Sequence, residues 1–148
     1  MATTGIQALI TEGLFKALAV QAYTGKDKTG TPVALPYAWP EQAFDPSTVS
    51  RYLRVDIAFN NHGFQTLNDE KVERMGFLIV NVVYPKLTGI ITPTEVAAAI
   101  ELAWKKGTTI IYNSIKIKVM PAPYQGSPLS DATRVSLPVN IPWKAYTN

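Results

Sequence analysis

The stretch that decides the fold runs from Arg51 to Lys106, and its two strand segments are 52-YLRVDIAF-59 and 76-GFLIVNVVY-84. The first segment places apolar residues mostly at alternate positions, which is typical of a half-buried strand. The second is almost wholly apolar, which is typical of a strand covered on both faces. The sequence 92-TPTE-95 then predicts the start of a helix, because Thr92 suits the N-cap, Pro93 the first helical position and Glu95 a capping box.

Helical spacing predicts two helices. Apolar residues three and four positions apart predict the first over Ile6–Ala22, with Gly25 as its stop. The second is expected to run from Pro93 to about Lys106 and to end at Gly107. Each helix would present one apolar face to the rest of the domain.

Three further segments predict strands. Thr108–Met120 alternates apolar and polar residues and is divided near Asn113, and Arg134–Tyr146 also alternates. Pro32–Pro40 is apolar but holds three prolines. Because proline cannot donate to a strand ladder, we expect this segment and Arg134–Tyr146 to lie at edges. Such an edge either pairs with a neighbouring copy or is kept from pairing by its prolines, and both alternatives stay open.

Together these elements predict one α+β domain over residues 1–148. We expect a mostly antiparallel sheet of four to five strands, with two main helices packed on one face. Two connections are longer than a hairpin requires, Asn60–Lys71 and Pro121–Thr133. Long ordered loops on a compact scaffold commonly carry binding, so both loops are candidate interfaces.

Composition excludes several kinds of site. The 148 residues include no cysteine, so the chain has no disulfide, thiolate nucleophile or sulfur-ligated metal. A net charge of +3 is too small to indicate nucleic-acid binding without clustered lysines. Only 17% of the residues are charged, which suits an assembly component and an apolar monomer about equally. We expect neither a signal peptide nor a membrane anchor, because Glu12 and Lys16 interrupt the apolar residues near the start.

Few residues are candidates for catalysis. His62 is the single histidine, and as a general base it would have Asp69 or Glu70 behind it. Its glycine- and asparagine-rich neighbours favour an exposed loop histidine instead. Asp69, Glu70 and Glu73 lack the spacing of a calcium loop, so we expect a solvated cluster. The chain is therefore expected to be no enzyme and to hold no metal or cofactor.

Lysines and tryptophans suggest two other kinds of surface. Lys116 and Lys118 share one face of a predicted strand and, with Lys105 and Lys106, could meet DNA. A solvent-facing strand and a helix end explain the same lysines, and we favour that interpretation. Three tryptophans are expected to anchor the core or an interface: Trp39, Trp104 and Trp143.

Several segments, taken in order, resemble one known family. They are 35-LPYAWP-40, 52-YLRV-55, 74-RMGFLIVNVVYP-85, 117-IKV-119, 123-PY-124 and 134-RVSLPVNIPW-143. This order resembles the tail terminator-like proteins of long-tailed bacteriophages over nearly the whole chain. The loop Asn60–Lys71 and the turn Lys26–Thr31 depart from the family pattern.

The resemblance implies a structural virion protein of the tail–neck region, assembled in the host cytoplasm. It would form a ring, expected to hold six copies, that caps the head-proximal end of the tail tube and stops tube polymerisation. The ring would also provide the joining surface for the head. Implied partners are its own copies, the major tail tube protein and a head–tail connector or neck protein, with tape-measure protein or DNA in the lumen and no membrane. The alternative is a head–tail adaptor or tail-completion protein elsewhere in the neck.

The expected interface residues come from both long loops and both proline-marked segments. In the loops they are Asn60, Asn61, His62, Phe64, Asp69, Glu70, Lys71, Tyr124, Gln125, Leu129 and Asp131. In the proline-marked segments they are Trp39 and Trp143. Lys116 and Lys118 are the candidates for a DNA channel or another charged surface.

Overall fold

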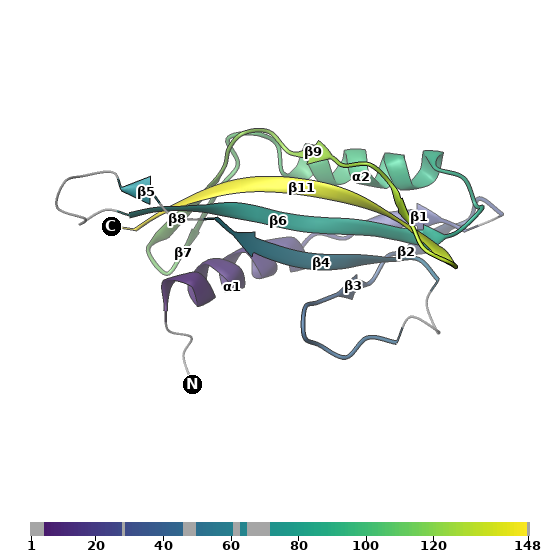
Figure 1. The fold of residues 1–148 in the computed structure, drawn as a ribbon, viewed down its shortest axis with the longest axis horizontal. Helices are drawn as coiled ribbons and strands as arrows, with labels where there is room; N and C mark the ends of the chain where they lie inside the picture. Colours follow the sequence, from purple (N-terminus) through teal and green to yellow (C-terminus); the bar gives the residue numbers. More distant parts are fainter. Residues whose placement is uncertain (1–4, 28, 46–49, 61–62, 65–71, 148) are drawn as a thin grey trace.

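The fold is that of a computed structural model, which describes residues 5–27, 29–45, 50–60, 63–64 and 72–147. Its elements are α1 (Ile6–Ala19), β1 (Thr24–Lys26), β2 (Pro32–Ala34), β3 (Tyr37–Ala38), β4 (Tyr52–Phe59), β5 (Gly63–Phe64), β6 (Val72–Pro85), α2 (Ile91–Ala103), β7 (Thr109–Tyr112), β8 (Ile115–Val119), β9 (Tyr124–Gln125), β10 (Leu129–Ser130) and β11 (Arg134–Thr147). Figure 1 shows a long curved sheet whose central strands run along the longest dimension.

Within the described residues, the strands form a β1–β2 hairpin and one sheet of nine strands. The order in the large sheet is β3-β4-β6-β11-β8-β7, with β5 beside β6 and both β9 and β10 beside β11. Among the strand pairs of this sheet that the structure describes, only β3–β4 is parallel. The predicted α+β class with a mostly antiparallel sheet is therefore confirmed. The predicted count of four to five strands is wrong, because segments expected to be loops contribute the short strands β5, β9 and β10.

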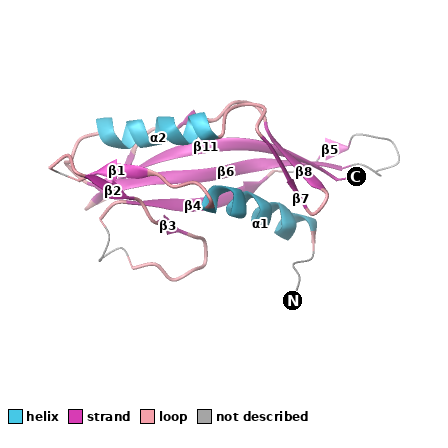
Figure 2. Ribbon diagram, turned by 180° about the vertical axis from the view of Figure 1, so that it is seen from behind, coloured by secondary structure: helices cyan, strands magenta, loops and turns pink. Residues whose placement is uncertain are grey.

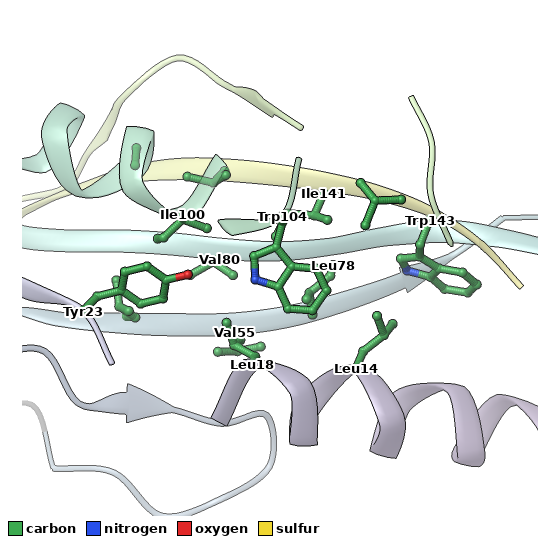
Figure 3. Packing of buried hydrophobic residues seen from close by; sticks show 14 of the residues in the cluster. Leu14, Leu18, Tyr23, Val55, Leu78, Val80, Ile100, Trp104, Ile141 and Trp143 are labelled. Atoms are coloured by element: carbon green, nitrogen blue, oxygen red, sulfur yellow. The ribbon is translucent and has the colours of Figure 1, made fainter. Parts of the chain in front are cut away.

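One face of the sheet carries the main core. The register places three apolar rows across β4, β6 and β11: Leu53–Val82–Leu137, Val55–Val80–Val139 and Ile57–Leu78–Ile141. Leu14 and Leu18 of α1 pack against these rows, as do Ile100 of α2 and Trp104, which directly follows α2 (Figure 3). Figure 2 shows both helices in front of the sheet when it is seen from behind. Both helices therefore cover the same face and remove it from water.

The final strand, β11, is central rather than at an edge, so that prediction is wrong. It pairs with β6 along one side and with β8, β9 and β10 along the other. The carbonyl oxygens of Pro138 and Pro142 accept bonds from the backbone of Gly126 and Met120, at 2.8 and 3.2 Å. The missing N–H of each proline therefore faces the side where three short strands meet β11. Pro138 lies between the partners of β10 and β9, and Pro142 between those of β9 and β8, so neither proline interrupts the continuous β6 ladder.

Both helices differ from prediction at their ends. Helix α2 begins at Ile91, and its N-cap is Ile90 rather than Thr92, with no capping bond from a side chain. The hydroxyl of Thr94 instead donates back to the Ile90 carbonyl oxygen at 2.7 Å. Helix α1 ends at Ala19, before the predicted stop at Gly25, which lies in β1. The capping pattern was present in the sequence, but α2 begins two residues earlier than that pattern indicates.

The hairpin β7–β8 forms where a divided strand was predicted. Its two turn residues, Asn113 and Ser114, have φ angles of 48° and 66°. Two successive positive φ angles are typical of the tight hairpin turn that matches strand twist. The turn therefore converts one predicted strand into two.

Candidate assembly surfaces

The predicted interface residues of the first long loop are only partly described. Asn60 is exposed just after β4, and its N–H donates to the Met75 carbonyl oxygen at 2.8 Å. Phe64 belongs to β5, whose backbone pairs with β6. The remaining predictions in this loop lie outside the described residues: Asn61, His62, Asp69, Glu70 and Lys71. The expectation that His62 is an exposed loop histidine, and the alternative that it is a base, are therefore both untested.

The second long loop lies along β11. Tyr124 and Gln125 form β9, and Leu129 belongs to β10. Tyr124 and Leu129 nevertheless keep exposed side chains, so they remain interface candidates. Asp131 has a local role, because its carboxylate accepts bonds from the N–H groups of Thr133 and Arg134, at 2.8 and 2.6 Å. These bonds lower the pKa of Asp131.

The tryptophans fall into two groups. Trp143 is 1% exposed and Trp104 is equally buried, so both belong to the core of a single copy. The prediction of Trp143 as an interface residue is therefore corrected: its ring fills the space over Gly76 and meets Phe59 edge-to-face, with ring centroids 5.3 Å apart. Trp39 remains partly exposed.

A hollow of about 530 Å³ lies between α1 and Trp39, and we call it the α1 groove. Its lining residues are Ala8, Thr11, Glu12, Phe15, Lys16, Ala19, Trp39 and Gln42. The rings of Phe15 and Trp39 lie 5.1 Å apart and form the aromatic part of the groove. Small residues on the helix leave that aromatic surface accessible, so the groove can receive an apolar side chain.

The two charges in the α1 groove neutralise each other. Lys16 Nζ lies 3.2 Å from Glu12 Oε1 and donates to the Tyr112 hydroxyl at 3.0 Å. That hydroxyl in turn donates to the Glu12 carboxylate. The bond to Tyr112, followed by that to Glu12, raises the pKa of Lys16. The groove is therefore apolar in character although it contains an acid and a base.

The turn between β6 and α2 exposes a cluster of apolar side chains, which we call the β6–α2 knob. It comprises Leu87, Ile90 and Ile91, which are 94%, 43% and 73% exposed. Leu87 also has a φ of 65°, a conformation that costs an L-residue roughly 1–2 kcal/mol. An exposed leucine on a strained backbone has no evident role in the stability of one copy, and strain of this kind often marks a functional contact. Sequence reasoning missed the knob, although 85-PKLTGII-91 shows apolar residues within a turn.

Charged groups surround the knob. Leu87 shares a hollow of about 550 Å³ with Lys26, Asp27 and Arg51. Arg51 stacks over the Tyr84 ring, with its guanidinium carbon 5.2 Å from the ring centroid, and its Nε is buried without a hydrogen-bond partner in the described part of the chain. The Asp27 carboxylate accepts bonds from Thr29 and Thr31, which lower its pKa and commit it to its own turn.

A basic strip lies on the sheet face opposite the main core. Lys116 is exposed and Lys118 partly exposed, because both alternate with the buried residues of β8. Lys144 of β11 lies directly opposite Lys118 in the register. The strip gathers lysines on one face of the sheet, so it is a candidate surface for an anionic partner. Lys105 and Lys106 are exposed just after α2.

The described residues include no group of three histidine, cysteine, aspartate or glutamate side chains placed to hold a metal ion. Within the same residues, no helix has both the length and the apolar character needed to cross a membrane.

Comparison with known proteins identifies a family and a shared fold. The sequence pattern of the phage tail terminator protein family matches residues 13–143. One solved chain superposes with a TM-score of 0.73 at 21% sequence identity, over 96% of each chain, which shows a shared fold. No curated protein matches the chain.

Proposed function

Because the chain belongs to the phage tail terminator protein family, we propose that it forms a ring at the head-proximal end of the tail tube. There it stops addition of further tube subunits and provides the surface to which the neck joins. The family itself identifies the chain as a phage tail structural protein. We further propose that the ring holds six copies and lies in the tail–neck region.

The observation that carries this proposal is the family match, and the surface supports it. The chain has a closed apolar core and yet leaves the β6–α2 knob and Leu102 exposed at opposite ends of α2. Exposed apolar groups of this size suit protein–protein contacts. A ring between tube and neck needs several different contacts, namely one to each neighbouring copy, one to the tube and one to the neck.

The ring would stop growth of the tail tube because its two faces differ. One face of the ring would bind the last ring of the major tail tube protein, and the opposite face would bind a head–tail connector or neck protein. Tube growth stops if that opposite face cannot bind another tube subunit. The basic strip of Lys116, Lys118 and Lys144 is the proposed surface for DNA in the lumen, because its lysines lie on one face of the sheet and phosphate groups bind clustered cations.

Deletion of the gene tests this proposal. Electron microscopy of tails assembled without the protein should show tubes of uncontrolled length that lack attached heads, and supplying the protein in trans should restore uniform length. Tails of normal length that fail to join heads would instead support an adaptor or tail-completion role in the neck. Normal, head-attached tails would contradict both roles.

A further inference from the structure

Two apolar features of the surface are suited to meet each other across a contact between copies. The β6–α2 knob projects three apolar side chains, and the α1 groove is a hollow lined by small residues and two aromatic rings. Figures 1 and 2 place α1 and the β6–α2 turn in different halves of the molecule. A copy therefore cannot seat its own knob in its own groove, whereas two copies can meet in this way.

The charges beside the two features also complement each other. Next to the groove, Glu41 is exposed beside Gln42, and its φ of 55° is another strained exposed position. Next to the knob, Lys86 is exposed, and its Nζ donates to the Asp131 carbonyl oxygen at 3.2 Å rather than to a carboxylate.

The net charge of the neighbouring groups is positive beside the knob and negative beside the groove. On the knob side, the positive groups Lys26, Arg51 and Lys86 outnumber the negative groups Asp27 and Glu95. On the groove side, Glu12 and Lys16 cancel, which leaves the exposed Glu41 as a negative group.

We propose that the β6–α2 knob of one copy occupies the α1 groove of a neighbouring copy, with Lys86 of the first facing Glu41 of the second. The contact joins two different surfaces, so it is heterologous, and repetition of a heterologous contact closes a ring when its rotation permits. This proposal rests on the proposed function, which requires such a ring. It also explains the two strained turns, since each presents a side chain to the partner copy.

Disulfide crosslinking tests the contact, because the chain contains no cysteine of its own. One full-length chain carries Leu87→Cys, and a second, distinguished by a mass tag, carries Ala19→Cys in the groove. The two are mixed at high concentration, alone and with assembled tail tubes, under mild oxidation. We expect a heterodimeric disulfide in at least one condition, formed at least ten times faster than in the control.

The matched control replaces Leu87→Cys by Leu102→Cys, since Leu102 is also exposed, at 75%, but lies near the far end of α2. Equal crosslinking by Leu87→Cys and Leu102→Cys in both conditions, or none by either, overturns the proposed contact. Each variant needs an unchanged melting transition before mixing, and Ala8→Cys, elsewhere in the groove, replaces Ala19→Cys if that variant misfolds.

Charge reversal gives an independent test of the same contact. Lys86→Glu and Glu41→Lys should each lower the assembled fraction several-fold in sedimentation with tail tubes, and the double variant should restore it. Lys105→Glu, an exposed lysine away from the knob, is the control and should have no effect. A double variant that assembles no better than the single ones contradicts the pairing.

Failure of this contact and failure of the proposed function give different results. If deletion of the gene lengthens the tails but the crosslink is absent, the chain is a terminator with a different interface. If the crosslink forms but tails without the protein have normal length and attached heads, the contact is real and the terminator role is wrong.

Discussion

At the scale of single residues, Gly76 shows how a strand makes room for an aromatic core. It is paired with Phe59 on one side and with Trp143 on the other. A Cβ at this position would lie 2.0 Å from the Ala58 carbonyl oxygen and 2.8 Å from Trp143 Cζ2. The glycine is therefore required by close approach, because the backbone oxygen cannot move without breaking the sheet.

Gly76→Ala should consequently destabilise the protein. Overpacking a core commonly costs about 1–3 kcal/mol, and a clash with backbone places this change at the upper end of that range or beyond it. The measurement is urea unfolding followed by tryptophan fluorescence. Ser130→Ala, at an exposed position of β10, is the control and should stay within about 0.5 kcal/mol of the parent protein. A Gly76→Ala protein with unchanged stability would contradict the packing around Trp143.

Leu87 differs from an ordinary leucine, because its removal should not destabilise a single copy. Leu87→Gly relieves a positive φ worth roughly 1–2 kcal/mol, while glycine adds an entropic cost of roughly 0.5–1 kcal/mol. The melting temperature should therefore be unchanged or slightly higher. Leu102→Gly, within α2, should instead cost about 1 kcal/mol. An equal loss of stability in the two variants would show that Leu87 is not strained.

Asp131 gives the protein one source of acid sensitivity. Bonds from Thr133 and Arg134 lower its pKa in the folded state, whereas in the unfolded state it has an ordinary value of about 3.9. At acidic pH the folded state therefore binds fewer protons than the unfolded state. The stabilisation that the ionised Asp131 gives to the fold is complete above the ordinary pKa, and it is lost as the pH falls through the lowered pKa. Asp131→Asn cannot titrate. The urea midpoints of the parent protein and Asp131→Asn should therefore converge between about pH 5 and pH 2. A constant difference would contradict this role.

At the scale of elements, β11 combines one continuous ladder with one interrupted ladder. The N–H groups of its odd-numbered residues face β6, and those of its even-numbered residues face the three short strands. This arrangement lets Pro138 and Pro142 occupy a central strand. Prolines confined to the interrupted side also limit how the short strands can slide along β11.

The effect of a proline substitution in β11 on stability should therefore depend on whether the N–H at that position faces β6 or the short strands. Pro138→Thr is expected to change the free energy of unfolding by less than about 1 kcal/mol, because the N–H that it adds faces a gap between β9 and β10. Val139→Pro removes a bond to β6 and should cost about 3 kcal/mol or more. Unfolding by urea compares the two variants, and similar losses would contradict the assigned orientation of β11.

The elements also show what the sequence could predict. Alternation in Tyr52–Phe59 and the apolar run in β6 were sufficient to identify two central strands, because burial dictates those patterns directly. The position of β11 was not predictable from its prolines, since their effect depends on which side of the strand their missing N–H faces. That side is determined by partner strands distant in the sequence.

Candidate surfaces were harder to predict than the fold. Trp143 and Trp39 are the same residue type beside prolines. Trp143 is buried in the central strand β11, whereas Trp39 follows the edge strand β3 and lines a groove. The β6–α2 knob was missed for a related reason. An apolar residue in a turn can fold back on the core, and only the backbone geometry shows that Leu87 does not.

At the scale of the whole molecule, the chain is a one-sided sheet with both helices on one face and unlike surfaces at its two ends. This asymmetry suits a subunit that repeats around a ring, because each copy presents a different surface to each of its two neighbours. Membership of the phage tail terminator protein family makes the chain a phage tail structural protein. We propose that the ring it forms lies at the head-proximal end of the tube.

The most direct measurement of that claim is the position of the protein on purified tails. Antibody against the protein, detected with gold particles in electron micrographs, should label one end of each tail, and in intact virions that end should adjoin the head. Label along the whole tube, at the tip distant from the head, or absent from tails would contradict the account.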